Sequence, residues 1–282
     1  MIRITETARD AMQGLSNFIP TELKISYVNA LLQVGFDIVD CGSFVSEKVI
    51  PQMADTPQVL QSIQQAKDGT GLMALVVNTK GVQKALQFNE LSYLSYPFSV
   101  SPTFLKRNLN ANVKDALGQL HEMMQLTDSH SIEWVVYLSM ALGNPYGDRW
   151  SVKMVVDTAE KLYRLGIRNM PLSDILGQAS PDTIYEVYHA IIPAFPDVDF
   201  GLHLHTLKAD SYRKLEAAYE AGVRSFETVI NGLGGCPTAS DNMVGNLSTQ
   251  ELIAFCEHKK IEHQLNHDLL NAASRIAAEA GL

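Results

Sequence analysis

Regular alternation of apolar, β-rich runs with amphipathic helical runs is the feature that most constrains how this chain can fold. Eight runs are predicted strands, over 2–6, 36–41, 72–77, 91–96, 132–139, 168–173, 198–204 and 224–229. Helices are predicted over 22–34, 55–66, 80–88, 111–127, 151–165, 180–193, 209–221 and 248–258, with a tail helix over 266–280. Gly35, Gly166 and Gly222 follow three of these helices, where a glycine commonly ends a helix.

Eight strand–helix units with no linker between them predict an α/β fold, a closed parallel (β/α)8 TIM barrel with a C-terminal helical tail. The alternative is an open, doubly wound sheet. No G-x-G-x-x-G motif follows the first predicted strand, which disfavours a dinucleotide-binding version of that sheet. A length of 282 residues is usual for a barrel of this kind. The sequence therefore predicts one domain over residues 1–282.

Composition excludes several other classes of protein. No apolar run approaches the ~18 residues of a membrane span, and residues 1–6 form a predicted strand rather than a targeting segment. Cys41, Cys236 and Cys256 are too few and too scattered for a disulfide framework, which predicts a reducing, cytoplasmic location. The net charge of −9 disfavours nucleic acid as a partner.

Polar residues gather at the carboxyl ends of the predicted strands, where a barrel of this kind carries its active site. They are Arg9, Asp10 and Gln13 after the first strand, Asp40 and Ser43 after the second, Tyr137 and Asn144 after the fifth, Asp174 after the sixth, His203 and His205 at the seventh, and Cys236 and Asn246 after the eighth. The strand starts carry no comparable set. The sequence therefore predicts the site at the carboxyl ends.

Four of these residues form a candidate metal site. His203 and His205 are two residues apart on a predicted strand, so their side chains point to the same side. Together with the carboxylate of Asp10 and the amide oxygen of Asn246, they suit a hard or borderline divalent cation. Structural roles are the alternative: hydrogen-bonded histidines in the core, and an Asp10 that caps a turn beside Arg9.

The glycine-rich segment Gly232-Leu-Gly-Gly-Cys-Pro237 predicts a loop that closes over a ligand. A thiol is a competent proton donor, so Cys236 is a candidate general acid. A glycine-rich hairpin with a small buried cysteine is the alternative. Cys41 and Cys256 are predicted to be packing residues.

Taken together, these motifs resemble those of the 3-hydroxy-3-methylglutaryl-CoA lyases over nearly the whole chain. Arg9-Asp-Ala-Met-Gln13 and His203-Leu-His205 are similar to the R-D-x-x-Q and H-x-H of the wider group of metal-dependent, aldolase-like lyases and synthases. Narrower matches to the lyases are Ser43-Phe-Val-Ser-Glu-Lys48 with Pro51-Gln-Met-Ala-Asp55 (S-F-V-S-P-K…P-Q-M-x-D), Met140-Ala-Leu-Gly-Asn-Pro-Tyr146 (C-A-L-G-C-P-Y), and the segments 232–237 and 245–249.

The resemblance implies a divalent-metal-dependent carbon–carbon lyase that performs a retro-Claisen cleavage of the hydroxymethylglutaryl-CoA lyase type, with acetoacetate and acetyl-CoA as products. It implies that Mg²⁺ or Mn²⁺ is bound by Asp10, His203, His205 and Asn246. Arg9 would stabilise an enolate oxygen, Cys236 would protonate the carbanion, and Asp10 could also serve as the base. The substrate site would be lined or supported by Gln13, Asp40, Ser43, Tyr137 and Asp174. Lys48, Lys106 and Arg107 are candidates for contact with the CoA phosphates, or else solvated surface residues. We expect a homo-oligomer, a dimer.

Several positions depart from the lyase pattern. Asp40 stands where the lyases have Glu, Ala11 where they have Gly, Thr206 where they have Asp, Gln250 where they have Glu, and Asn144 where they have Cys. These changes leave open an aldolase or lyase that acts on another hydroxyacyl-CoA or hydroxy-oxo acid, or a non-catalytic binding barrel.

Overall fold

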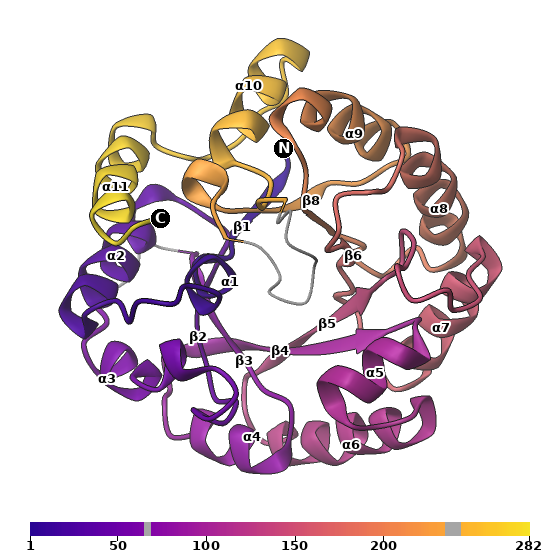
Figure 1. Ribbon diagram of the computed structural model, residues 1–282, viewed down its shortest axis with the longest axis horizontal. Coiled ribbons are helices and arrows are strands. Elements are labelled where there is room, and N and C mark those ends of the chain that lie inside the picture. The colour runs from indigo at the N-terminus through magenta and orange to yellow at the C-terminus, as the bar shows by residue number, and fades with distance from the viewer. Residues whose placement is uncertain (65–68, 235–243) are drawn as a thin grey trace.

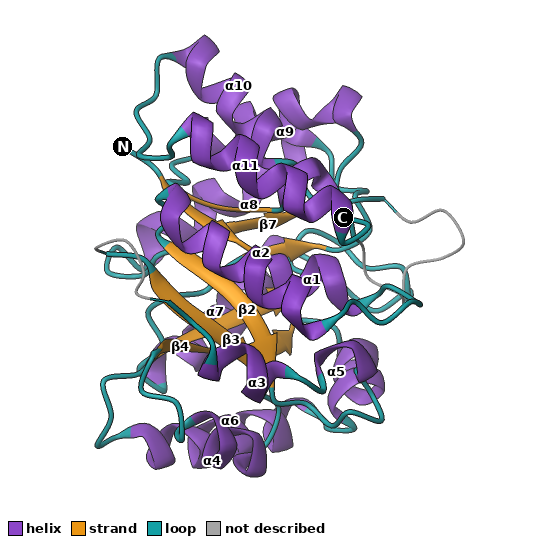
Figure 2. Ribbon diagram, turned by 90° about the vertical axis from the view of Figure 1, so that its left-hand side faces the viewer, coloured by secondary structure: helices purple, strands orange, loops and turns teal. Residues whose placement is uncertain are grey.

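A closed barrel of eight parallel strands forms the centre of the molecule, in the order β1-β2-β3-β4-β5-β6-β7-β8 (Figure 1). The structure is a computed structural model, and it describes residues 1–64, 69–234 and 244–282. Helices surround the barrel in Figure 1, and Figure 2 places α1 and α5 toward one end and the N-terminus toward the other. The predicted (β/α)8 barrel is confirmed.

The strands are β1 Arg3–Glu6, β2 Ile38–Ser43, β3 Gly71–Leu75, β4 Leu91–Ser99, β5 Glu133–Ser139, β6 Leu172–Asp174, β7 Leu202–Leu204 and β8 Ser225–Thr228. The helices are α1 Ala8–Gln13, α2 Thr21–Val34, α3 Thr56–Gln61, α4 Thr79–Ala85, α5 Pro102–Leu109, α6 Val113–Thr127, α7 Val152–Arg164, α8 Pro181–Ala194, α9 Lys208–Glu220, α10 Thr249–Lys259 and the tail helix α11 His267–Glu279, with short 3-10 turns η1 Pro51–Met53 and η2 Ile230–Gly232. Every described helix is too short or too polar to cross a bilayer.

Two helices were not predicted. The expected helix over 111–127 is α6, and α5 precedes it, because Ser101 caps the amide of Phe104 and Pro102 fits the first helical turn. Helix α1 follows β1 directly, so Arg9 and Asp10 lie on a helix rather than on the strand end. Both helices are short, so neither shows a clear apolar period in the sequence.

The structure also corrects several boundaries. The sixth and seventh strands were expected from 168 and 198, but β6 and β7 have three residues each. Pro171 has no amide to donate to the ladder, and Asn169 pairs with Asp199 only as an isolated bridge. Helix α3 ends at Gln61, before the expected residue 66. Gly35 ends α2 in the left-handed conformation with φ of 101°, as expected.

Apolar packing holds the barrel at two levels. Ile38, Met73, Val135 and Tyr137 pack together in one small cluster of buried side chains. A larger cluster joins the strands to the surrounding helices, and α7 illustrates it: buried Val155, Ala159 and Leu162 recur at helical spacing along one face. Such a rigid frame fixes the positions of side chains at the strand ends.

Glu6 is an unusual member of the layer between barrel and helices, because it is a carboxyl with no exposed surface. Its partners are neutral: the hydroxyl groups of Tyr27 and Thr249 and the amide of Ile230. Burial raises the pKa of Glu6 to about 8, although these hydrogen bonds act to lower it. Glu6 is therefore mainly protonated at neutral pH.

Glu6→Gln is expected to stabilise the protein at neutral and alkaline pH. The folded state keeps a proton that the unfolded chain releases above its ordinary pKa near 4.5, so stability falls as pH rises from 4.5 to about 8. Glutamine removes that loss, which amounts to about 3 kcal/mol at pH 7 at ~1.4 kcal/mol per pKa unit. Urea unfolding at pH 5 and pH 8 measures it, with exposed Glu22→Gln on α2 as control. An equal effect at both pH values would contradict the raised pKa.

Candidate active site

Residues from both ends of the chain meet at one mouth of the barrel. Helix α1 places Asp10 beside the end of β1, and β7 carries His203, with His205 next along the chain. Ligand atoms of these three residues lie within 4.8 Å of one another. Asn246 pairs with His205 through a backbone bridge, and its Nδ2 donates to Asp10 Oδ2 at 3.3 Å. The structure thus brings together the four residues of the predicted metal site.

The two histidines are oriented by hydrogen bonds at Nδ1. Nδ1 of His203 lies 2.7 Å from Glu227 Oε2, and Nδ1 of His205 lies 3.1 Å from the carbonyl oxygen of Val244. Both partners are acceptors, so each Nδ1 carries a proton, and Nε2 presents a lone pair when the imidazole is neutral. His205 Nε2 lies 4.0 Å from Asp10 Oδ2. This donor set fits a divalent cation, and a half turn of the Asn246 amide would present its oxygen.

The surroundings of the site favour an anionic Asp10 and a neutral His205. Burial acts to raise the pKa of Asp10, but Arg9, His203 and His205 outweigh it and lower that pKa. Burial, followed by the neighbouring His203, lowers the pKa of His205. For His203, burial acts downward, but the bond to Glu227 raises the net pKa. A cation at Nε2 of His203 would therefore compete with a proton.

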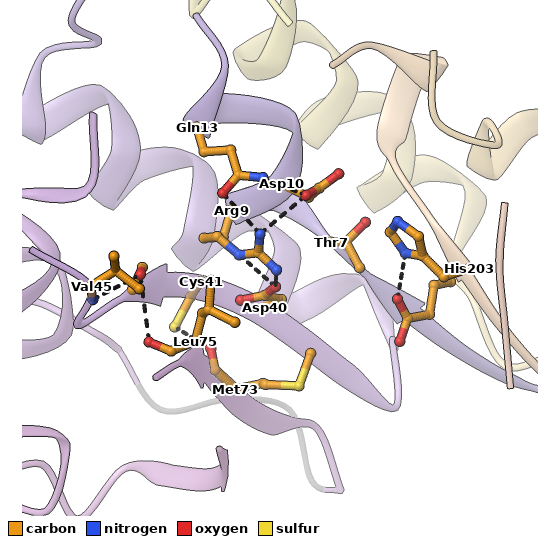
Figure 3. Close-up of polar contacts among 12 residues, drawn as sticks. Thr7, Arg9, Asp10, Gln13, Asp40, Cys41, Val45, Met73, Leu75 and His203 are labelled. Carbon is orange, nitrogen blue, oxygen red and sulfur yellow. Dashed lines mark hydrogen bonds and ion pairs between the residues drawn. The ribbon is translucent and has the colours of Figure 1, made fainter. Parts of the chain in front are cut away.

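Arg9 is held by three side chains (Figure 3). Its Nε and Nη2 donate to Asp40 Oδ2 at 2.9 and 2.6 Å, and its Nη1 donates to Asp10 Oδ1 and Gln13 Oε1, both at 3.1 Å. Asp40, one methylene shorter than the glutamate of the lyase pattern, still reaches the guanidinium. Burial raises the pKa of Asp40 to about 6, although Arg9 acts to lower it. Arg9 is thus a fixed cation beside Asp10.

A cavity of about 190 Å³ opens at this mouth. Arg9, Asp10, Gln13, Tyr137, His203 and His205 line it, together with apolar residues that include Leu75, Val77, Phe104 and Ile175. The hydroxyl of Tyr137 is buried and has no hydrogen-bond partner among the described residues. Burial raises the pKa of Tyr137 far above its ordinary value, so the hydroxyl stays protonated. Tyr137 is therefore a donor available to a ligand.

Two predicted substrate residues are engaged with the protein backbone. Ser43 Oγ accepts from the amide of Val45, and Asp174 accepts from the amide of Ala179 at 2.8 Å. Neither lines the cavity, although Ser173 and Ile175 do. In this arrangement Ser43 and Asp174 support the loops that follow β2 and β6.

The basic residues expected to contact CoA lie on exposed loops and helices near the cavity. Lys48 precedes Val49, which lines the cavity. Lys106 donates to Asn110 at 2.7 Å, and the guanidinium of Arg107 lies 4.8 Å from the ring centroid of Tyr146. Cys236, the expected general acid, lies outside the described residues.

One departure from the lyase pattern, Asn144, has a structural role here, and a second, Ala11, lies against a constrained glycine. Asn144 Oδ1 accepts from the amides of Tyr146 and Asp148, which caps the turn after β5. Ala11 faces Gly234, where φ is +86° and an added Cβ would lie 2.6 Å from the Ala11 Cα. The glycine at 234 is therefore needed for the loop to approach α1 so closely.

Glu227 is the functional residue that sequence reasoning missed. It pairs in register with His203 across β7 and β8, is nearly buried, and fixes the imidazole. The available signal was an acidic residue within the apolar run of the eighth strand. Alternate side chains of a barrel strand point into the barrel, and a carboxyl buried there needs a hydrogen-bond or ion-pair partner.

Comparison with known proteins identifies the family of this chain. A family model described as HMGL-like matches residues 2–276. The mitochondrial hydroxymethylglutaryl-CoA lyase of Bos taurus is 30% identical over 280 residues, covering 99% of this chain and 85% of that protein. The Bacillus subtilis HMG-CoA lyase structure superposes with a TM-score of 0.93 at 28% identity, covering 99% of this chain and 94% of that one.

A further solved structure carries ligands in its description. The HMG-CoA lyase of Acinetobacter baumannii, in complex with coenzyme A and 3-methylmalate, superposes with a TM-score of 0.91 at 27% identity, covering 99% of this chain and 91% of that one. The match of family model, relatives and fold extends over nearly the whole chain. This chain belongs to the HMGL-like family, and it is a lyase.

Proposed function

We propose that this enzyme cleaves 3-hydroxy-3-methylglutaryl-CoA into acetoacetate and acetyl-CoA with the aid of a divalent cation. The observation that carries this proposal is the convergence of Asp10, His203 and His205 beside the fixed cation of Arg9 in one cavity. The relatives are named as lyases of this substrate, and the Acinetobacter baumannii structure contains coenzyme A. The alternatives of another hydroxyacyl substrate or a binding barrel have no comparable support.

Asp10, His203, His205 and Asn246 would hold the cation, and we propose Mg²⁺ or Mn²⁺. The bound cation would polarise the tertiary hydroxyl of the substrate and lower its pKa. A carboxylate, imidazoles and an amide oxygen are ligands that both ions accept. Nδ1 bonds to Glu227 and Val244 fix the ring orientations that this role requires.

The remaining steps belong to side chains of this protein. Asp10, anionic at neutral pH, would take the proton of the hydroxyl as the C2–C3 bond breaks, which releases acetoacetate and leaves the electron pair on C2 as a thioester enolate. Arg9 would offset the charge that develops on the enolate oxygen. Tyr137 would donate a hydrogen bond to the bound substrate from its hydroxyl, which has no partner among the described residues. Cys236 would then protonate C2, which yields acetyl-CoA.

Lys48, Lys106 and Arg107 would meet the phosphates of the CoA arm. The three cations are exposed, and their neighbours Val49, Phe104 and Asn108 line the cavity. Because the protein carries a net charge of −9, an anionic ligand needs local cations at its binding site. These three side chains would supply them. The cytoplasmic location, the dimer and the absence of nucleic-acid partners stay predictions from the sequence.

A steady-state assay with both products tests the proposal. The purified enzyme, stripped with EDTA and then given Mg²⁺ or Mn²⁺, is expected to form acetoacetate and acetyl-CoA in equal amounts from 3-hydroxy-3-methylglutaryl-CoA. EDTA is expected to abolish the reaction. Failure to cleave this thioester with either ion, while other hydroxyacyl-CoAs are cleaved, would overturn the proposed substrate.

Cys236→Ser is expected to lose most of the turnover with little change in KM. A serine hydroxyl is a far weaker acid than a thiol, and proton donation is a transition-state role, so kcat falls rather than binding. Steady-state kinetics measure the split, with Cys256→Ser on α10 as a matched thiol control. Near-normal turnover in Cys236→Ser would mean that another group is the acid.

A further inference from the structure

We propose that Glu6 is a positioning residue for the metal centre: its carboxyl holds Ile230 and Thr249 and thereby fixes Asn246. The inference rests on the proposed role of Asn246 as a metal ligand. Glu6 itself lies at the end of β1 and does not line the cavity, and its hydrogen-bond partners are Tyr27, Ile230 and Thr249 rather than any of the proposed metal ligands.

The carboxyl of Glu6 contacts the chain on both sides of Asn246, once at Ile230 and once at Thr249. Its Oε1 accepts from the amide of Ile230 at 3.0 Å, where η2 leaves β8. Its Oε2 lies 3.2 Å from the hydroxyl of Thr249, the first residue of α10. Tyr27 of α2 donates to Oε1 at 3.3 Å and anchors the carboxyl from the helix side. One side chain therefore joins Ile230 and Thr249 to the barrel and to α2.

Asn246 lies three residues before the second of these anchors. The amide of Leu247 donates to Leu204 of β7 at 2.8 Å, and the carbonyl of Leu247 accepts from Val229 after β8 at 3.0 Å. Residues 246–249 thus run along the carboxyl ends of β7 and β8, and Thr249 lies against Glu6. Because Asn246 Nδ2 already reaches Asp10 at 3.3 Å, a small shift of this segment would move a ligand out of the site.

Hydrogen-bond counting indicates which form of Glu6 does this. Thr249 Oγ1 lies 2.9 Å from Thr228 Oγ1 as well as near Glu6, and one hydroxyl has only one proton to donate. A protonated carboxyl gives each of the three contacts a donor and an acceptor. The O–H of Glu6 donates to the hydroxyl of Thr249, that hydroxyl donates to Thr228, and the other oxygen of Glu6 accepts from the amide of Ile230. A glutamine amide offers the same donor and acceptor at the same places. Alanine offers neither.

Binding of Mn²⁺ to the full-length protein, measured by calorimetry or by the EPR signal of the free ion, tests the role of Glu6. Glu6→Ala is expected to weaken binding about tenfold, within the range found when groups behind metal ligands are removed. Glu6→Gln is expected to stay within about twofold of the wild type, because it keeps both hydrogen bonds. Tyr188→Phe removes another buried hydroxyl bond, to the carbonyl of Gly201, and is expected to leave binding unchanged.

Hydrogen exchange gives a second measurement that does not depend on the ion. The amides of Ile230 and Leu247 are expected to exchange faster in Glu6→Ala than in Glu6→Gln or Tyr188→Phe. If Glu6→Ala does not fold, Thr249→Val replaces it, since it removes only the contact at the second anchor. The same direction of change is then expected, with a smaller loss of affinity.

The outcomes separate this inference from the proposed function. Equal Mn²⁺ affinity in the wild type, Glu6→Ala and Thr249→Val would overturn the positioning role and leave the metal centre intact. Weakened binding in Tyr188→Phe as well would show that any loss of stability moves the site. A wild type that binds no Mn²⁺ would overturn the metal centre itself, and the inference with it.

Discussion

His203→Ala is expected to abolish metal-dependent cleavage and to weaken Mn²⁺ binding by more than a factor of about 100. The change removes one of three ligand atoms that lie within 4.8 Å of one another, and loss of groups behind metal ligands alone costs about 10- to 100-fold. Titration calorimetry with Mn²⁺ and the steady-state assay measure the two effects. Glu227 loses its partner, so we also expect a loss of stability of about 1–3 kcal/mol.

Two further histidine variants make this result specific. His205→Ala is expected to weaken Mn²⁺ binding by the same factor. This variant keeps the hydrogen bond between His203 and Glu227. His189→Ala removes an exposed imidazole that stacks on Tyr185 of α8 and is expected to change neither binding nor turnover. If His203→Ala and His205→Ala still bound Mn²⁺ normally, the histidines would be structural.

Arg9→Gln is expected to raise the barrier by about 3 kcal/mol, comparable to the loss of one oxyanion donor, which lowers kcat by about two orders of magnitude. The guanidinium is fixed by Asp40, Asp10 and Gln13 and stays charged, because neighbouring carboxylates raise its pKa against the effect of burial. Such a preorganised charge acts on the transition state more than on binding. KM and Mn²⁺ affinity should therefore change far less than kcat.

Arg9→Lys is the matched control for charge against geometry. Lysine keeps the charge but cannot donate in the same fork to Asp40, so partial activity is expected. An Arg9→Gln variant that loses Mn²⁺ and recovers full turnover when the ion is saturating would give Arg9 a structural role, as the holder of Asp10.

The barrel was predictable because its signal is repeated along the chain. Apolar periodicity identified all eight strands, and Gly35 marks a helix end by its left-handed backbone. Boundaries were less predictable where pairing decides them: Pro171 shortens β6 by removing a donor from the ladder. Helix α5 was not predicted because its eight residues are stabilised by the Ser101 cap and by contacts with α6, and are too few to show a clear apolar period.

The placement of the candidate metal ligands was predictable for a similar reason. His203 and His205 share a strand face, and the barrel rule places Asp10 and Asn246 at the same mouth. Glu227 and Glu6 were missed because their roles depend on which strands and helices become neighbours. Register pairs Glu227 with His203, and tertiary folding brings Glu6 to Thr249, 243 positions away.

Anomalous scattering from a crystal grown with Mn²⁺ tests the central claim most directly. We expect one strong anomalous peak at the barrel mouth, bound by Asp10, both histidines and the rotated amide oxygen of Asn246. The peak is expected to disappear in His203→Ala crystals under the same conditions. A peak elsewhere on the protein, or none at this mouth at saturating Mn²⁺, would contradict the account.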